Sequence, residues 1–431
     1  MSAPVSVSCP AGEVTGISYG DGTDRFHSIA YSAVDDGFSD ARKRPGGEAV
    51  DARVPDPESV ALSVLRPAGT APGADLPVIF DIHGGSFETG SHEDPRSPGA
   101  GCVDSGAVVV RVGYRTGIAG MARFRGDEPA HHRAIDDCQL ALEWVQKNIE
   151  DFGGDPTNVT LVGQSAGASI ALWLSRRDHY RGAFRRVLAC SPAFPRRGWE
   201  DRAGLFRTLL GKPLTRDSLR RVSPEHRDRA FRRFKRVLAL DLPLGPYPLD
   251  PGEMAEVDLV VTCTRDEFYD MPAARSMDKR GNGHLYIWAI ARPMGMTGMY
   301  RSWLEATRAV APRRVAARLI GDSMIRRWAQ YVADGAPGRV WLAEFTGAPD
   351  SPAVHCGELP ALFAAEGYDT DFPVHRWLMS YARTGEPGWP VYSDGRQAVE
   401  ISLVDGRFTP VVDPLRIARL AFPDPYRDGR D

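Results

Sequence analysis

Val159-Thr160-Leu161-Val162-Gly163-Gln164-Ser165-Ala166-Gly167 is an apolar run that leads into a serine flanked by two glycines. The run predicts a buried strand, and Ala168 to Leu172 predict the start of a helix. A Gly-x-Ser-x-Gly turn between a strand and a helix is typical of a nucleophile elbow, where the serine hydroxyl points out of a tight turn near the N–H groups of a helix N-terminus. The pentapeptide alone also fits a serine that only caps a helix, so other segments decide between these interpretations.

A second glycine-rich segment, His83-Gly84-Gly85-Ser86-Phe87, follows the predicted strand Leu76 to Ile82. A loop in this position, upstream of an elbow serine, offers backbone N–H groups to the carbonyl oxygen that becomes negative during acyl transfer. The alternatives are a simple Gly-Gly turn and a phosphate cradle. No strand-like run is followed by G-x-G-x-x-G or G-x-x-x-x-G-K-[ST], so we expect no cofactor.

An acid and a histidine should follow the serine in that order if the chain is an α/β-hydrolase. Leu259 to Cys263 predicts a buried parallel strand, and the loop after it carries Asp266 and Glu267. Further on, Val340 to Phe345 predicts another strand, and His355 lies in the loop that follows. His355 is thus the candidate base, with one of the two adjacent carboxylates as its partner.

At this point the chain resembles the type-B carboxylesterases, the cholinesterase-like branch of the α/β-hydrolases, over most of its length. The matching segments are Phe152-Gly153-Gly154-Asp155-Pro156-Thr157-Asn158-Val159-Thr160, Gly113-Tyr114-Arg115-Thr116-Gly117, Ala141-Leu142-Glu143-Trp144-Val145-Gln146, Asp266-Glu267-Phe268 and His355-Cys356-Gly357-Glu358-Leu359-Pro360. The resemblance implies that Glu267, and not Asp266, is the acid.

The leading hypothesis is therefore a carboxylesterase that forms an acyl-enzyme. In it Ser165 is the nucleophile, His355 the base and Glu267 the residue that orients it, while the oxyanion N–H groups come from Gly85, Ser86 and Ala166. Two alternatives stay open. Some relatives are catalytically silent binding modules that have lost triad residues, and a triad hydrolase can also act on amides, thioesters or lactones.

The chain departs from the family pattern at two positions near the candidate site. Gln164 stands where the family commonly has glutamate, and Ser86 where it usually has a third glycine. Phe87, next to Ser86, is the candidate substrate-binding residue. The side chain of Ser86 predicts a narrow acyl pocket and therefore a preference for short acyl esters.

Alternating strand and helix patterns predict a single α/β-hydrolase domain over residues 1–431, with a central, mostly parallel sheet flanked by helices. Two segments, at about 197–241 and 271–314, are too long for simple crossovers and predict helical cap insertions. The second is rich in methionine and aromatic residues. It is either a flexible apolar wall or ordinary core packing.

The composition excludes several other classes. A net charge of -3 from 53 Lys and Arg against 56 Asp and Glu gives no reason to expect a nucleic-acid partner or a membrane partner. Six dispersed cysteines fit buried thiols in a reducing compartment, and the N-terminus lacks a signal-peptide pattern, so we expect a cytoplasmic protein.

His131, His132 and Asp136 lie close together, but no further ligand cluster accompanies them, and we expect no metal site. The pattern carries no prediction of the oligomeric state.

Overall fold

The chain folds around one large, mostly parallel β-sheet. The computed structural model describes residues 2–128, 131–279 and 283–426. In spatial order the strands of the sheet are β1 (Ala3–Cys9), β2 (Gly12–Ser18), β3 (Thr23–Ile29), β7 (Leu62–Pro67), β9 (Val108–Val112), β8 (Leu76–Ile82), β10 (Gly154–Gln164), β11 (Arg186–Cys190), β12 (Asp258–Thr264), β13 (Val340–Thr346), β14 (Gln397–Ser402) and β15 (Phe408–Val412), with β6 (Val50–Asp51) beside β2. The small strands β4 (Ser32–Ala33) and β5 (Arg42–Lys43) pair separately.

The strands from β9 to β14 run parallel, whereas the first four strands of the path and β15 pair antiparallel with their neighbours. The central strands are buried along nearly their whole length, as expected for parallel strands covered on both faces. This architecture confirms the predicted α/β-hydrolase fold.

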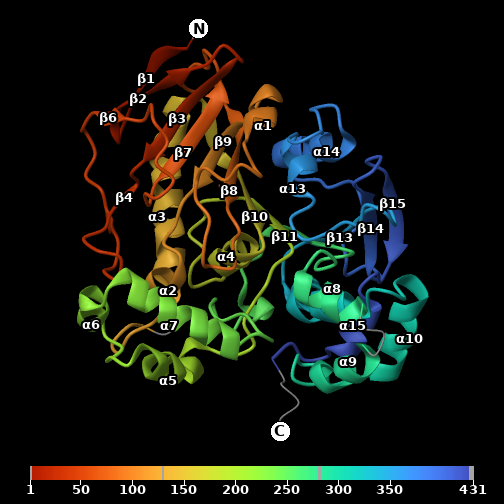
Figure 1. The fold of residues 1–431 in the computed structure, drawn as a ribbon. Helices are drawn as coiled ribbons and strands as arrows, with labels where there is room; N and C mark the ends of the chain where they lie inside the picture. The colour runs from red at the N-terminus through yellow and green to blue at the C-terminus, as the bar shows by residue number, and fades with distance from the viewer. Residues whose placement is uncertain (1, 129–130, 280–282, 427–431) are drawn as a thin grey trace.

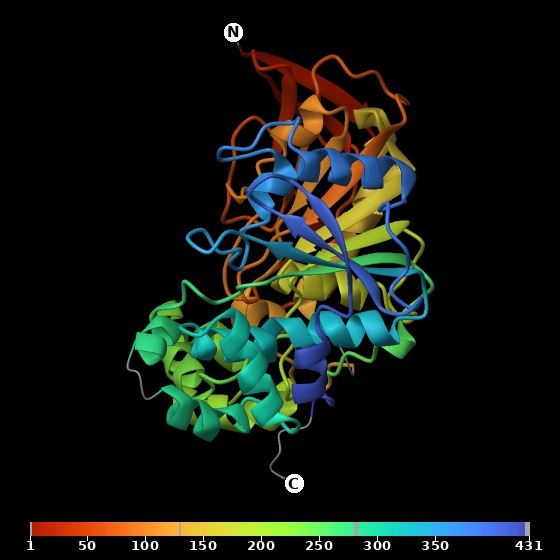
Figure 2. The ribbon, with the colours of Figure 1, turned by 90° about the vertical axis from the view of Figure 1, so that its right-hand side faces the viewer.

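Helices cover both faces of the sheet (Figures 1 and 2). Alternate strand residues enter different cores: Val78 and Phe80 belong to one hydrophobic cluster, and Ile79 belongs to the other. The helices with residues in the first cluster include α3 (Arg133–Asn148), α4 (Ala166–Leu174) and α12 (Arg327–Gly335). Those in the second are α1 (Ala100–Asp104), α13 (Leu359–Phe363) and α14 (Pro373–Thr384). The remaining helices outside the insertions are α2 (Gly117–Met121), α11 (Val315–Gly321) and α15 (Arg416–Ala421).

Both predicted insertions are helical and lie at the same end of the molecule, at the bottom of Figure 1. The first insertion (197–241) contains α5 (Trp199–Leu210), α6 (Arg216–Arg221) and α7 (Pro224–Val237). The second insertion (271–314) contains α8 (Pro272–Lys279), α9 (Gly283–Ala291) and α10 (Tyr300–Val310). They follow β11 and β12, so both leave the carboxyl ends of parallel strands, where α/β sheets place their functional groups.

The methionine and aromatic residues of the second insertion divide into two groups. Met294, Met296 and Trp303 are buried in a local hydrophobic core, whereas Trp288 and Met299 are exposed. For the three buried residues, ordinary packing is the better interpretation. In the described ranges, no helix combines the length and the apolar character needed to cross a membrane.

Candidate active site

Ser165 lies at a strained turn between β10 and α4. Its φ of 54° is in the left-handed region, which residues other than glycine rarely adopt, and its N–H donates to the Cys190 carbonyl at 2.8 Å. Both flanking glycines are required by close backbone contacts. A Cβ on Gly167 would lie 1.9 Å from the Ile82 carbonyl oxygen, and one on Gly163 would lie 2.4 Å from the Gly167 carbonyl oxygen. The strand–turn–helix geometry is that of a nucleophile elbow.

The loop after β8 lies directly against this elbow. A Cβ on Gly84 would come within 3.4 Å of Ser165 Cβ, so the two segments are in contact. Gly85, Ser86 and Phe87 all have positive φ, at 119°, 55° and 61°, and this unusual run turns the backbone sharply. Ser86 is exposed and Phe87 is fully buried. Ala166 is the first residue of α4, where N–H groups lack intrahelical partners.

The structure places Glu267, and not Asp266, against His355. Glu267 Oε2 lies 2.6 Å from His355 Nδ1, and Glu267 is almost completely buried. Its other oxygen accepts hydrogen bonds of 2.8 Å from Ser191 Oγ and from the Thr264 N–H. Asp266 instead accepts a bond of 3.2 Å from the Ala353 N–H, a contact that holds the loop.

The other ring nitrogen of His355 faces the elbow. Gln164, which precedes Ser165, places Nε2 at 3.4 Å from His355 Nε2, and Phe268 stacks on the same ring at 5.3 Å. Burial lowers the pKa of His355, but the charge and hydrogen bond of Glu267 outweigh it and raise the pKa above its ordinary value. An imidazole held by a carboxylate on one side, and in contact with the residue before a strained serine on the other, is an arrangement suited to proton transfer.

Glu358 is a buried carboxylate that the sequence prediction did not single out, although it lies in the segment after His355. It has no exposed surface, and neither of its oxygens accepts a hydrogen bond from another described residue. Burial raises the pKa of Glu358 to about 7, and the nearby charge of Glu267 acts in the same direction. Ser191 was also missed; its position directly after β11, at a carboxyl strand end, was the available signal.

Cys356, beside His355, is half-buried and lies 3.4 Å from an Arg96 nitrogen. Burial and the charge of Glu358 raise the pKa of its thiol to about 12. At neutral pH the thiolate form that reacts with electrophiles is therefore scarce. The other five cysteines are also free, and none of the six forms a disulfide in the described part of the chain.

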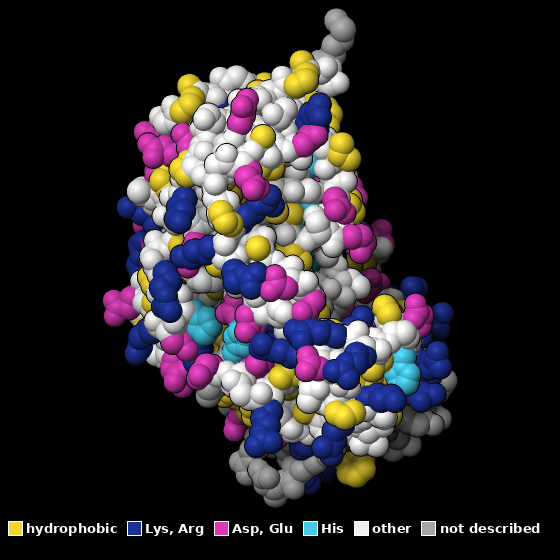
Figure 3. All heavy atoms as spheres, turned by 90° about the vertical axis from the view of Figure 1, so that its left-hand side faces the viewer, with side chains coloured by type: hydrophobic (Ala, Val, Ile, Leu, Met, Phe, Trp, Pro, Cys, Tyr) yellow, Lys and Arg dark blue, Asp and Glu magenta, His cyan; other side chains and the backbone are white. Residues whose placement is uncertain are grey.

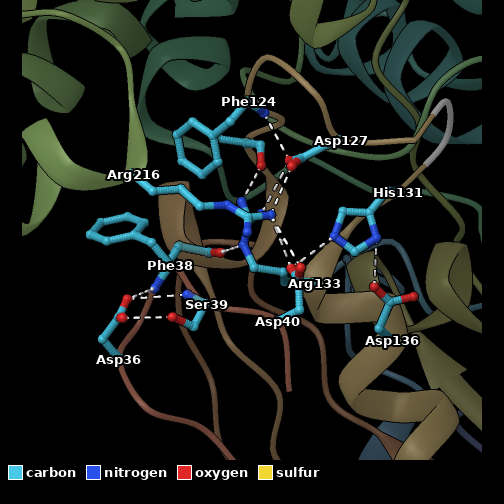
Figure 4. A network of polar contacts seen from close by, with 12 residues as sticks. Asp36, Phe38, Ser39, Asp40, Phe124, Asp127, His131, Arg133, Asp136 and Arg216 are labelled. Carbon is cyan, nitrogen blue, oxygen red and sulfur yellow. Dashed lines mark hydrogen bonds and ion pairs between the residues drawn. The ribbon is translucent and has the colours of Figure 1, made fainter. Parts of the chain in front are cut away.

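The histidines considered as metal ligands have other partners, and Figure 4 shows those of His131. His131 uses one nitrogen for Asp136 at 2.9 Å and the other for Asp40 at 3.1 Å. His132 is buried and bonds to the Met121 carbonyl instead. Asp40 also pairs with Arg216 of α6, so the network ties the first insertion to the body. Among the residues that the structure describes, no group of three or more His, Cys, Asp or Glu side chains is arranged to hold a metal ion.

A parallel sheet with a serine elbow after one strand, and with a carboxylate and a histidine after later strands, defines an α/β-hydrolase. Residues 50–197 match the model of the carboxylesterase family. The matched segment is similar to the carboxylesterases, and the relatives support an enzyme that hydrolyses carboxylic esters.

Known relatives cover most of the chain. It is 26% identical to phenmedipham hydrolase of Pseudarthrobacter oxydans over 410 residues, which are 82% of this chain and 81% of that protein. It is also 26% identical to para-nitrobenzyl esterase of Bacillus subtilis over 404 residues, 80% of this chain and 79% of the relative. A solved para-nitrobenzyl esterase structure has the same fold, with a TM-score of 0.76 at 23% identity, and the match covers 97% of this chain and 99% of that one.

Proposed function

We propose that the protein hydrolyses small carboxylic esters through Ser165, His355 and Glu267, with an acyl-enzyme intermediate. The observation that carries the proposal is the position of the His355 ring between Glu267, at 2.6 Å, and the elbow that bears Ser165. A base that takes the proton of a serine hydroxyl needs this orientation. We further propose that residues 1–431 act as one domain, with the two insertions as its caps.

The proposed reaction has two halves. Ser165 Oγ attacks the ester carbonyl carbon while His355 Nε2 takes the serine proton, and Glu267 stabilises the resulting imidazolium. Backbone N–H groups of Gly85, Ser86 and Ala166 donate to the negative oxygen of the tetrahedral intermediate. His355 then protonates the leaving alcohol as the ester C–O bond breaks. Water attacks the acyl-enzyme with the same base, and the acid is released.

The strained serine favours catalysis over a silent binding role. A φ of 54° at a non-glycine residue costs roughly 1–3 kcal/mol and persists only where the surroundings enforce it. Such strain is concentrated at functional sites, and a binding module has no evident need for it. Amides, thioesters and lactones undergo the same acyl-transfer chemistry, so a substrate panel has to include them.

Replacing Ser165 by alanine tests the proposal. We expect Ser165→Ala to fold with an unchanged melting temperature and to lose at least about 10³-fold in kcat on 4-nitrophenyl esters, because the nucleophile is absent. The melting temperature serves as the control for folding. Turnover within tenfold of the unmodified protein would refute the assignment.

We also propose a preference for short acyl groups, which the exposed Ser86 and its neighbour Phe87 support. Ser86→Gly removes a side chain at a φ of 55°, which glycine adopts without strain, so the N–H persists while the pocket widens. We expect the original protein to prefer short acyl groups, from acetyl through butyryl, over longer ones, and the variant to gain on hexanoyl and octanoyl esters. The measurement is kcat/KM across the series. An octanoyl optimum in the original protein would contradict this.

We propose the cytoplasm as the compartment in which the protein acts. The support is that all six cysteines are free, four of them buried, as is usual where thiols stay reduced.

A further inference from the structure

A groove of about 890 Å³ lies beside the oxyanion loop. Its lining comes from four parts of the chain: the segment before β5, the end of the oxyanion loop, the start of α2, and α6 with α7 of the first insertion. The groove therefore separates the body of the protein from the first insertion.

The inner wall of the groove is bonded to the oxyanion loop. The N–H groups of Glu88 and Thr89, which line the groove, donate to the Gly85 carbonyl at 2.9 and 3.1 Å. From the α2 side, the Gly117 N–H donates to the Phe87 carbonyl at 2.6 Å. Since Gly85 and Phe87 belong to the loop whose Gly84 contacts the Ser165 elbow, backbone hydrogen bonds connect the groove lining to the proposed oxyanion loop.

Two of the cations that line the groove are neutralised by its carboxylates. Arg220 pairs with Asp36 at 2.9 Å, and Lys235 pairs with Glu88. The remaining acid of the lining, Asp228, forms no ion pair among the described residues.

Two further cations in the groove form no ion pair with a carboxylate in the described ranges. Arg227 lies over the Phe38 ring at 5.2 Å and donates only to the Leu219 carbonyl, at 3.1 Å. Arg232 is exposed and makes no hydrogen bond or ion pair within the same ranges. They belong to an insertion that carries 13 Lys and Arg against 6 Asp and Glu, an excess of 7, although the whole chain has a net charge of -3. Figure 3 shows Lys and Arg side chains gathered over the lower half of this side of the molecule.

The same groove has an apolar floor. Phe38 is buried, while Phe231 and Ile118 are partly exposed. A ligand that fits such a lining has an apolar body and an anionic end. Guanidinium groups bind a carboxylate through two parallel N–H donors. Among the described residues, Asp228 is the one lining carboxylate without an ion pair that could compete with such a ligand.

We infer that this groove recognises esters that carry a free carboxylate remote from the bond that is cleaved, with Arg232 and Arg227 as the residues that select them. The inference rests on the proposed ester hydrolysis at Ser165 and deepens it by naming a substrate class. Arg232 and Arg227 are specificity-determining residues and take no part in the bond-breaking steps.

Matched pairs of substrates test this inference. One pair places the charge on the alcohol side, 4-acetoxybenzoate against 4-acetoxybenzamide; the other places it on the acyl side, the phenyl monoester of adipic acid against its terminal amide. We expect kcat/KM to favour the carboxylate about threefold to tenfold in at least one pair, the range of a partly screened ion pair, and to lose that preference at high salt. Arg232→Glu should abolish or reverse the preference while leaving turnover of the neutral member unchanged.

Arg229→Glu is the matched control, because Arg229 lies on the same helix, is also exposed and unpaired among the described residues, and does not line the groove. Ratios near one in both pairs, or an equal effect of both substitutions, overturn the inference. Turnover of the neutral ester reports separately on the proposed function. If no ester is turned over, calorimetric titration of the Ser165→Ala protein with the same pairs decides the inference, and equal affinities reject it.

Discussion

At the scale of single residues, the site depends on two adjacent carboxylates with different roles. Glu267 holds His355 and is itself held by Ser191 and a backbone N–H, whereas the Asp266 carboxylate accepts from an N–H of the loop that carries His355. The resemblance to known esterases predicted Glu267 as the acid, and Glu267 is the carboxylate that contacts His355. Periodicity and strand order alone left both carboxylates as candidates, because both follow the same strand.

Exchanging each carboxylate for its amide separates the two roles. We expect Glu267→Gln to lower kcat by about 10³- to 10⁴-fold, because the amide no longer stabilises the imidazolium, and Asp266→Asn to lower it less than about tenfold. Glu267→Gln should also lower the midpoint of the kcat/KM pH profile, since Glu267 raises the pKa of His355 and the base is active only when neutral. Greater damage from Asp266→Asn would reverse the assignment.

Glu358 predicts a pH dependence of stability. The pKa of Glu358 is about 7 in the folded protein, against an ordinary value of 4.5, so the folded protein keeps this proton at pH values where the unfolded chain has lost it. The free energy of unfolding therefore falls as the pH rises from 4.5 through 7. The loss amounts to about 3 kcal/mol. We expect Glu358→Gln to raise the melting temperature relative to the original protein at pH 8 and to change it little at pH 4.5. An equal shift at both pH values would contradict this account.

At the scale of secondary-structure elements, apolar runs predicted the central strands well, because buried parallel strands need little else. The predicted strands Leu259 to Cys263 and Val340 to Phe345 lie inside β12 and β13. A π-helical segment, Asp322–Arg326, leads into α12, and apolar periodicity in the sequence does not reveal it. The hydrogen bond from Ser191 to Glu267 forms because β11 and β12 are neighbours in the sheet. Local sequence patterns do not determine the order of strands in a sheet, so this contact could not be predicted.

The elbow requires glycine at position 167. An alanine there would place its Cβ 1.9 Å from the Ile82 carbonyl oxygen, a contact between β8 and α4 that cannot relax without moving the elbow. We expect Gly167→Ala to lower the free energy of unfolding by about 2 kcal/mol or more and to abolish ester turnover. Chemical denaturation and activity assays measure both effects.

Gly204 in α5 provides the control for that substitution. It is exposed, and a Cβ there would meet no atom within 4 Å. Gly204→Ala should therefore stabilise the protein by ~0.5–1 kcal/mol and leave activity unchanged. If both substitutions had the same effect, the close contact at Gly167 would not be the cause.

At the scale of the whole molecule, one end of the sheet collects the site and both insertions. The residues near the reaction centre come from the loops after β8, β10, β11, β12 and β13. Alternating strand and helix patterns predicted the fold class, but the net charge of -3 concealed the basic first insertion, because an average over 431 residues cancels opposite local charges. The groove beside that insertion could not be predicted for a different reason: its lining comes from segments far apart in the sequence.

The central claim is that Ser165 forms an acyl-enzyme, and mass spectrometry of the protein quenched during turnover of 4-nitrophenyl butyrate tests it most directly. We predict one added butyryl group per molecule, located on the peptide that contains Ser165, and none in the Ser165→Ala protein. Acylation of a different residue that turns over at the catalytic rate, or full activity with no acylated species under rapid quenching, would contradict the account.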